Sequence, residues 1–80
     1  MEDILTKVQQ AFHEAFDVDP LLVSMDTVPD NIPGWDSVGH LALASSLEST
    51  FGVSLNVDDL MEMENVREIV RVLQSKLNGA

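Results

Sequence analysis

The serine of the stretch Gly34-Trp35-Asp36-Ser37-Val38 is the side chain best placed in this sequence for covalent chemistry. It follows a Pro-Gly turn and precedes an apolar run with helical spacing, so Ser37 stands at the beginning of a predicted helix. The first backbone N–H groups of a helix are unpaired and its dipole is positive there, so a phosphodiester attached to this hydroxyl would be stabilised. The spacing by itself leaves open a simpler role, in which Asp36 or Ser37 only caps the helix.

Asp36, Ser37 and His40 also supply the residue types of a hydrolytic triad. A working triad needs an oxyanion site and a shaped pocket as well, and a chain of 80 residues leaves little room for them. On a helical wheel His40 is turned well away from Ser37. We therefore expect no catalytic residues in this chain.

A metal site is not expected either. Four aspartates crowd the segment 17–30: Asp17, Asp19, Asp26 and Asp30. In a calcium-binding loop of the helix-loop-helix type, however, Leu22 would occupy the glycine position and Val28 the position of the closing glutamate. His13 and His40 lack companions at the spacing of metal ligands, and the absence of cysteine excludes thiolate sites and disulfides.

The charge of the chain indicates the kind of partner. The chain has fourteen acidic and four basic residues, which gives a formal net charge of −10. The basic residues are Lys7, Arg67, Arg71 and Lys76. Nucleic acid is disfavoured as a ligand because phosphate contacts need clustered Lys and Arg, and an anionic membrane surface is disfavoured for the same reason. The expected partner is a protein with a basic surface, although high charge also serves solubility.

Length and hydropathy indicate a single domain over residues 1–80. No apolar run approaches the ~20 residues that cross a bilayer, so no membrane insertion is expected. The acidic start MEDILTK does not resemble a signal peptide, which predicts a cytoplasmic location.

Four helices are predicted. Apolar residues at helical spacing favour a first helix over residues 2–16, and the second should run over 37–51 and end at Gly52. Asn56 and Asn65 are cap residues, the first for a short helix over 57–61 and the second for a last helix. The apolar stripe of that last helix comprises Val66, Ile69, Val70, Leu73 and Leu77. The fold class is therefore all-α, with three main helices and one short helix around one core.

A long loop connects the first two helices, because three prolines and Gly34 interrupt residues 17–36. A loop of this length inside a compact domain is usually functional. Its apolar side chains are expected to fix it to the core: Leu22, Val23, Met25, Val28 and Ile32. Trp35 is expected to pack its ring on this loop. The segment 53–55 has the composition of a strand but no partner to pair with.

The second helix has two apolar faces. Leu43, Leu47 and Phe51 form a stripe that faces the core. Roughly opposite lie Val38, Leu41, Ser45 and Glu48, with Ser37 and Ala44 along the edge. Exposed Val38 and Leu41 beside the serine would suggest a docking surface, unless the long loop folds over them. Gly39 weakens the helix and would permit the close approach of a partner.

These features together resemble an acyl carrier protein. Gly34-Trp35-Asp36-Ser37-Val38 followed by the apolar helix to Phe51 is similar to the phosphopantetheine attachment site of that family, and the helix order agrees over nearly the whole chain. The resemblance implies a four-helix carrier bundle in which Ser37 is modified with 4'-phosphopantetheine from coenzyme A. The serine hydroxyl attacks the β-phosphate of coenzyme A on a separate phosphopantetheinyl transferase. The thiol of the attached arm then holds an acyl or related group as a thioester.

The resemblance also implies a set of interface residues. Asp36 would stay ionised beside the attachment point, Val38 and Leu41 would contact partner enzymes, and Glu48 would offer them a charge. Met61, with Leu60 and Met63, would border a region that shelters the cargo, although methionines at this position also serve as flexible core filler. An internal cargo cleft between the second and third helices is a hypothesis of this resemblance.

Further partners follow from the same likeness: an acyl-loading ligase or acyltransferase, and downstream synthase enzymes with basic surfaces. The early acidic residues of fatty-acid carriers are replaced here by Gly39, His40 and Ala42. This departure argues against fatty acid synthase as the main client. Gly34-Trp35-Asp36-Ser37 with His40 is more similar to a freestanding carrier of a specialised pathway, and a monomer is expected. The alternative is an acidic protein-interaction module of the same fold without the arm.

Overall fold

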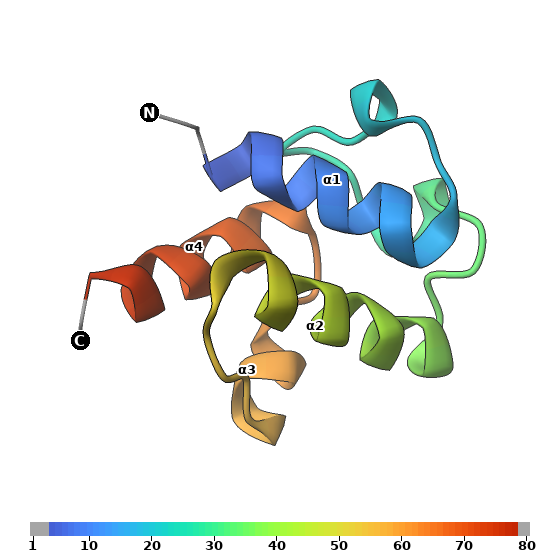
Figure 1. The fold of residues 1–80 in the computed structure, drawn as a ribbon. Helices are drawn as coiled ribbons and strands as arrows, with labels where there is room; N and C mark the ends of the chain where they lie inside the picture. Colours follow the sequence, from blue (N-terminus) through green and yellow to red (C-terminus); the bar gives the residue numbers. More distant parts are fainter. Residues whose placement is uncertain (1–3, 79–80) are drawn as a thin grey trace.

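Four α-helices make up the regular structure of the chain in a computed structural model, which describes residues 4–78 (Figure 1). They are α1 (Ile4–Phe16), α2 (Ser37–Phe51), α3 (Val57–Glu62) and α4 (Val66–Leu77). Within these residues there is no strand, and no helix is both long and apolar enough to cross a membrane. The all-helical class with three substantial helices is confirmed. The predicted start of the first helix lies outside the described residues, and α3 is one residue longer than predicted.

Local capping explains why the helix boundaries were predictable. Three helices begin at a side chain that accepts a hydrogen bond from the backbone N–H three residues later: Asp36, Asn56 and Asn65. At the other end of α2, Gly52 has a φ of 67°, a left-handed conformation that glycine adopts without a steric penalty. Each of these signals depends on residues within one turn of the helix end.

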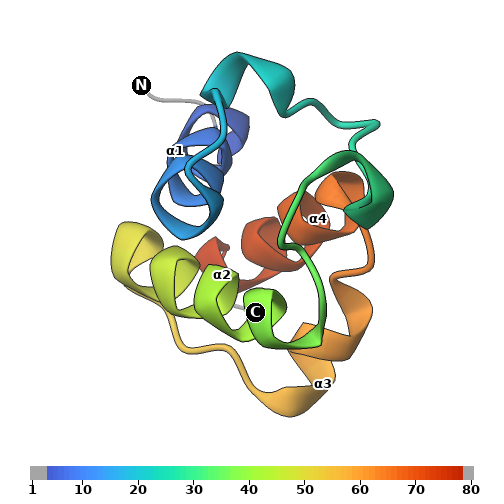
Figure 2. The same cartoon turned by 90° about the vertical axis from the view of Figure 1, so that its right-hand side faces the viewer.

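The core lies between α1, α2 and α4, and α3 lies at the lower end of both views (Figures 1 and 2). Its largest fully buried side chains are Phe12, Leu43, Leu47, Met63, Ile69 and Leu73. Two details differ from the expected stripes. Leu77 is exposed while Val72 is buried, because the last turn of α4 extends past the core. Ala44, expected at the edge of the outward face of α2, is buried as well.

The long loop contains two 3₁₀ turns, Pro20–Leu22 and Pro29–Asn31, and is otherwise irregular. Val23 and Ile32 enter the core as predicted, but Leu22 and Val28 are exposed, so that part of the prediction is wrong. The reason lies in a contact between distant residues. The Gln9 amide of α1 donates a hydrogen bond to the carbonyl of Val23 at 2.7 Å. This bond holds Val23 against α1, and the preceding 3₁₀ turn leaves Leu22 facing solvent.

An ion pair joins α3 to α4. Lys76 Nζ lies 2.7 Å from Asp59 Oδ2, and only 14% of the Asp59 side chain is exposed. The hydrogen bond from Lys76, followed by one from the backbone N–H of Asn56, lowers the pKa of Asp59 below its ordinary value. The pair therefore stabilises the fold while Asp59 is ionised.

This ion pair predicts a pH dependence of stability. Because the folded-state pKa of Asp59 is lowered, its contribution is present above the ordinary aspartate pKa of about 3.9 and is lost as the pH falls through the folded-state value. Urea unfolding of wild type and Asp59→Asn should differ most near neutral pH, and the difference should shrink below about pH 4. A difference that stays constant across that range would show that the charge of Asp59 contributes nothing.

Candidate functional site

The turn into α2 leaves the Ser37 hydroxyl free. Asp36 is the N-cap, since its Oδ1 accepts a hydrogen bond from the backbone N–H of Gly39 at 2.8 Å. Ser37 is therefore the first residue of α2; it is exposed, and among residues 4–78 no hydrogen bond occupies its hydroxyl. Of the two candidate caps, Asp36 fills the role. Ser37 is consequently available to another enzyme at the positive end of a helix.

The division of roles between Asp36 and Ser37 can be measured. Asp36→Ala should lower the free energy of unfolding by about 0.5–2 kcal/mol, because the capping bond is lost, and Asp36→Asn should retain most of it. Ser37→Ala should change stability by less than about 0.5 kcal/mol, since its hydroxyl caps nothing. Thermal or urea unfolding of the three variants checks this order. A Ser37→Ala loss as large as that of Asp36→Ala would contradict the assignment.

Gly39 is required by the chain itself. A Cβ atom at this position would lie 1.8 Å from the carbonyl oxygen of Gly34 and 2.9 Å from Cε1 of Phe16. We predicted that Gly39 allows a partner to approach closely. The structure gives a different reason for the glycine, because the loop before Ser37 packs directly on the first turn of α2. Gly34 has a φ of 90°, which brings its carbonyl to this point.

Trp35 is buried, with 6% of its surface exposed, and its ring packs on aromatic side chains of α1. Its ring meets Phe12 edge-on at a centroid distance of 4.9 Å and also contacts Phe16. The indole N–H donates a hydrogen bond to Nδ1 of His40 at 2.8 Å, and Nε2 of His40 lies 2.9 Å from the carbonyl oxygen of Leu60. His40 thus bonds to both Trp35 and α3.

The outward face of α2 is exposed as the docking hypothesis requires. Val38 is 78% and Leu41 61% exposed, so the long loop does not cover them. Met61 of α3 is exposed too, and so is Val57, which sequence reasoning did not single out. The sequence did contain a signal for Val57, because it precedes Met61 by one helical turn and therefore shares its face of α3. These four side chains form what we call the apolar face.

Glu48 differs from the expectation of a free charge. It is half-buried, and its Oε2 accepts a hydrogen bond from the backbone N–H of Leu55 at 2.8 Å. The carboxylate therefore holds the connection between α2 and α3. Its negative charge contributes to the surface, but one oxygen is already engaged in the fold.

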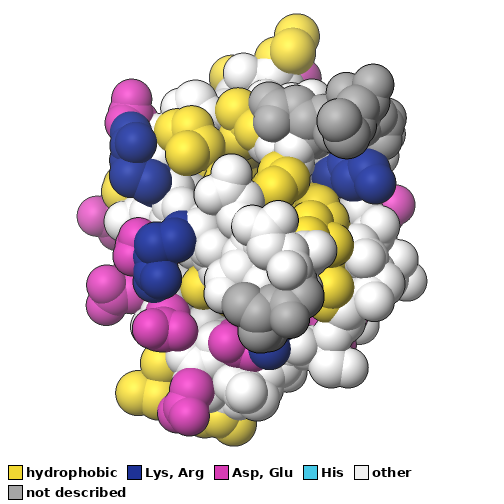
Figure 3. Space-filling model, turned by 90° about the vertical axis from the view of Figure 1, so that its left-hand side faces the viewer, with side chains coloured by type: hydrophobic (Ala, Val, Ile, Leu, Met, Phe, Trp, Pro, Cys, Tyr) yellow, Lys and Arg dark blue, Asp and Glu magenta, His cyan; other side chains and the backbone are white. Residues whose placement is uncertain are grey.

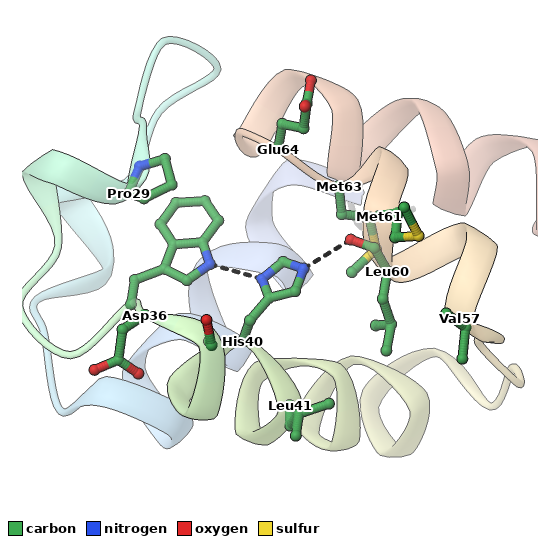
Figure 4. A pocket seen from close by; sticks show the side chains of 11 residues that line it. Pro29, Asp36, His40, Leu41, Val57, Leu60, Met61, Met63 and Glu64 are labelled. Atoms are coloured by element: carbon green, nitrogen blue, oxygen red, sulfur yellow. Dashed lines mark hydrogen bonds between the residues drawn. The ribbon is translucent and has the colours of Figure 1, made fainter.

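A pocket of about 490 Å³ opens beside Ser37, between the end of the long loop, α2 and α3 (Figure 4). Its lining is mostly apolar: Pro29, Trp35, Asp36, Ser37, His40, Leu41, Val57, Leu60, Met61, Met63 and Glu64. Sequence reasoning placed Leu60, Met61 and Met63 at such a site. It missed Pro29 and Trp35, which come from the loop, because only the tertiary fold brings the loop to α3.

Two acidic side chains, Asp36 and Glu64, line this pocket. Figure 3 shows the face of the molecule away from the start of α2, where further acidic side chains lie along the left edge and in the lower half and hydrophobic side chains project at the lower edge. The aspartates of the long loop have separate local roles. Asp19 accepts a hydrogen bond from the Leu21 backbone, and Asp26 pairs with Arg67 at 3.0 Å. Residues 4–78 contain no group of three His, Asp or Glu side chains able to hold a metal ion.

Comparisons with known proteins agree with this geometry. Residues 34–73 match a family model described as a phosphopantetheine attachment site. The chain is 31% identical over 78 residues to an acyl carrier protein of Cyanidium caldarium, covering 98% of this chain and 91% of that protein. It is 30% identical over 77 residues to the acyl carrier protein of Lactobacillus johnsonii, covering 96% of each.

A solved structure is similar over almost the same extent. The solution structure of holo acyl carrier protein from Geobacter metallireducens superimposes with a TM-score of 0.82 at 27% identity, covering 94% of this chain and 86% of that one. The fold, the attachment-site match and the sequence identity thus all indicate the same family. This chain belongs to the acyl carrier protein family, and it is a non-catalytic carrier of acyl intermediates on a phosphopantetheine arm.

Proposed function

We propose that Ser37 is the residue that bears the phosphopantetheine arm. The observation that carries this proposal is an exposed hydroxyl at the first position of α2, left free because Asp36 caps the helix. An attached phosphodiester would lie at the positive end of a helix of 15 residues, where unpaired N–H groups favour an anion. Asp36 stands beside it and adds to the acidic surroundings.

The surroundings of Ser37 fit the arm. The pocket begins at Asp36 and Ser37 and continues over apolar side chains of α2 and α3, so a flexible chain attached to the serine has a surface to rest on. When bound, the arm supplies a thiol, which this cysteine-free chain lacks. The thiol holds an acyl group as a thioester. The residues of the chain position the attachment oxygen and shape the pocket.

Membership of this family implies a phosphopantetheinyl transferase and pathway enzymes as partners. We infer that they dock on the apolar face defined above and that Asp36 and Glu48 attract basic residues at its edge. A surface with exposed Val38 and Leu41 but few early acidic residues favours clients of a specialised pathway. We further propose a single domain over residues 1–80 that acts as a freestanding, cytoplasmic monomer.

Intact mass spectrometry tests the attachment residue. The purified chain is incubated with coenzyme A, magnesium and a broad-range phosphopantetheinyl transferase, with a well-behaved carrier protein in a parallel reaction. We expect the mass of one phosphopantetheine to be added to wild type and to Ser45→Ala, an exposed serine of the same helix, and not to Ser37→Ala. An unmodified wild type beside a modified parallel carrier would favour an interaction module without the arm. Modification of Ser37→Ala would place the arm elsewhere.

A further inference from the structure

The two hydrogen bonds of His40 determine which of its nitrogens carries a proton. An indole N–H can only donate, so Nδ1 of His40 must accept from Trp35. A backbone carbonyl can only accept, so Nε2 must donate to the oxygen of Leu60. His40 is therefore a neutral imidazole with its proton on Nε2, and both of its polar atoms are engaged.

These bonds join three segments that are far apart in the sequence. His40 lies on the first turns of α2, Trp35 at the end of the long loop, and Leu60 on α3, 20 residues further along the chain. Figure 4 shows His40 between the two dashed lines, across the space between the loop and α3. The indole and imidazole rings are nearly parallel, with 15° between their planes. We call these three residues and their two bonds the His40 bridge.

The His40 bridge lies where the pocket borders the α2 side of the core. His40 lines the pocket, and on α2 it continues the stripe formed by Leu43 and Leu47, three and seven residues later. Both leucines are fully buried. A group that moved from the pocket toward the interior between α2 and α3 would therefore meet the imidazole before it reached them. It would have to break the bond to Leu60 or to displace the ring.

We propose that His40 is a specificity-determining residue that closes the inner end of the pocket, so that cargo on the arm is received in the outer pocket and excluded from the core. This inference rests on the proposed attachment of the arm at Ser37. The cargo class that fits is a short or polar acyl group, because the outer pocket is open to solvent and bordered by Asp36 and Glu64. A long alkyl chain would extend beyond the outer pocket into water, since the fully buried leucines that could cover more of it lie behind the bridge.

The first part of the test uses the unmodified chain and does not depend on the arm. Nitrogen NMR shifts of the His40 ring should show protonated Nε2 and unprotonated Nδ1. The indole N–H of Trp35 should exchange slowly with water in wild type and faster in His40→Ala. Protonation on Nδ1 at neutral pH, or an indole exchange rate unaffected by the variant, would overturn the bridge.

The second part uses the holo chain loaded with butyryl, octanoyl or dodecanoyl groups. Methyl shifts of Leu43 and Leu47 should be independent of chain length in wild type and should become dependent on it in His40→Ala. Ser45→Ala is the control, because Ser45 is an exposed residue of the same helix that lies outside the pocket and the bridge; there the core shifts should stay independent of chain length. If His40→Ala is poorly folded, His40→Gln removes the ring and retains an amide donor toward Leu60.

Core shifts in wild type that grow with chain length would overturn the proposal, as would a His40→Ala protein indistinguishable from wild type. Failure of the chain to accept any arm would overturn the proposed function, and with it the effect of His40 on cargo. The nitrogen shifts and indole exchange of the unmodified chain distinguish that failure from the absence of the bridge.

Discussion

Gly39→Ala is expected to destabilise the protein by about 2 kcal/mol, although alanine is the better helix former by up to about 1 kcal/mol. The added Cβ would lie 1.8 Å from the backbone oxygen of Gly34, and a backbone atom cannot move aside as a flexible side chain can. The loop before α2 would have to shift, and it carries Trp35 and Asp36. Urea unfolding measures the loss, and the rate of phosphopantetheine transfer to the proposed attachment residue Ser37 should fall with it.

Ser45→Ala is the control for this effect, because Ser45 is an exposed position on the same helix. It should change the free energy of unfolding by less than about 0.5 kcal/mol. If Gly39→Ala proved as stable as wild type or more stable, helix propensity would outweigh the contact between Gly34 and α2. The close packing of the loop on the helix would then not be a constraint on this sequence.

Leu47→Ala should produce the larger loss, about 2–5 kcal/mol, because Leu47 is fully buried between the helices and its removal leaves a cavity. At about 0.05–0.15 kcal/mol per residue, a chain of this length is stable by about 4–12 kcal/mol. The variant therefore loses a large part of its stability and is expected to unfold at a much lower urea concentration. Circular dichroism across a urea titration measures the shift.

Leu41→Ala makes the same chemical change on the same helix at a residue that is 61% exposed. Its unfolding midpoint should stay close to that of wild type, with a change below about 0.5 kcal/mol. Its modification by the transferase should slow, because the substitution removes part of the proposed docking surface. Equal losses of stability in the two variants would show that the two faces of α2 are not distinguished as the structure indicates.

The sequence was sufficient to predict the helices and the position of the candidate attachment serine. The caps Asp36, Asn56 and Asn65 and the terminating Gly52 act through bonds that span three or four residues, so their effect is visible in the local pattern. The acidic charge follows from composition, and the period of a single helix places Val38 and Leu41 on the face of α2 opposite the core stripe. Whether the long loop covers them was decided by the tertiary structure, which leaves both exposed.

Tertiary structure alone decided which loop side chains are buried and how the pocket is built. Val23 is held inward by Gln9, 14 residues away, while Leu22 beside it is exposed. His40 bonds to Leu60 across 20 residues, and Gly39 is needed because a loop carbonyl lies against it. Helical periodicity records which residues share a face, but it contains no information about which distant segment packs there. Those choices depend on the close packing of the whole chain, in which a backbone carbonyl or a ring fits at only one place.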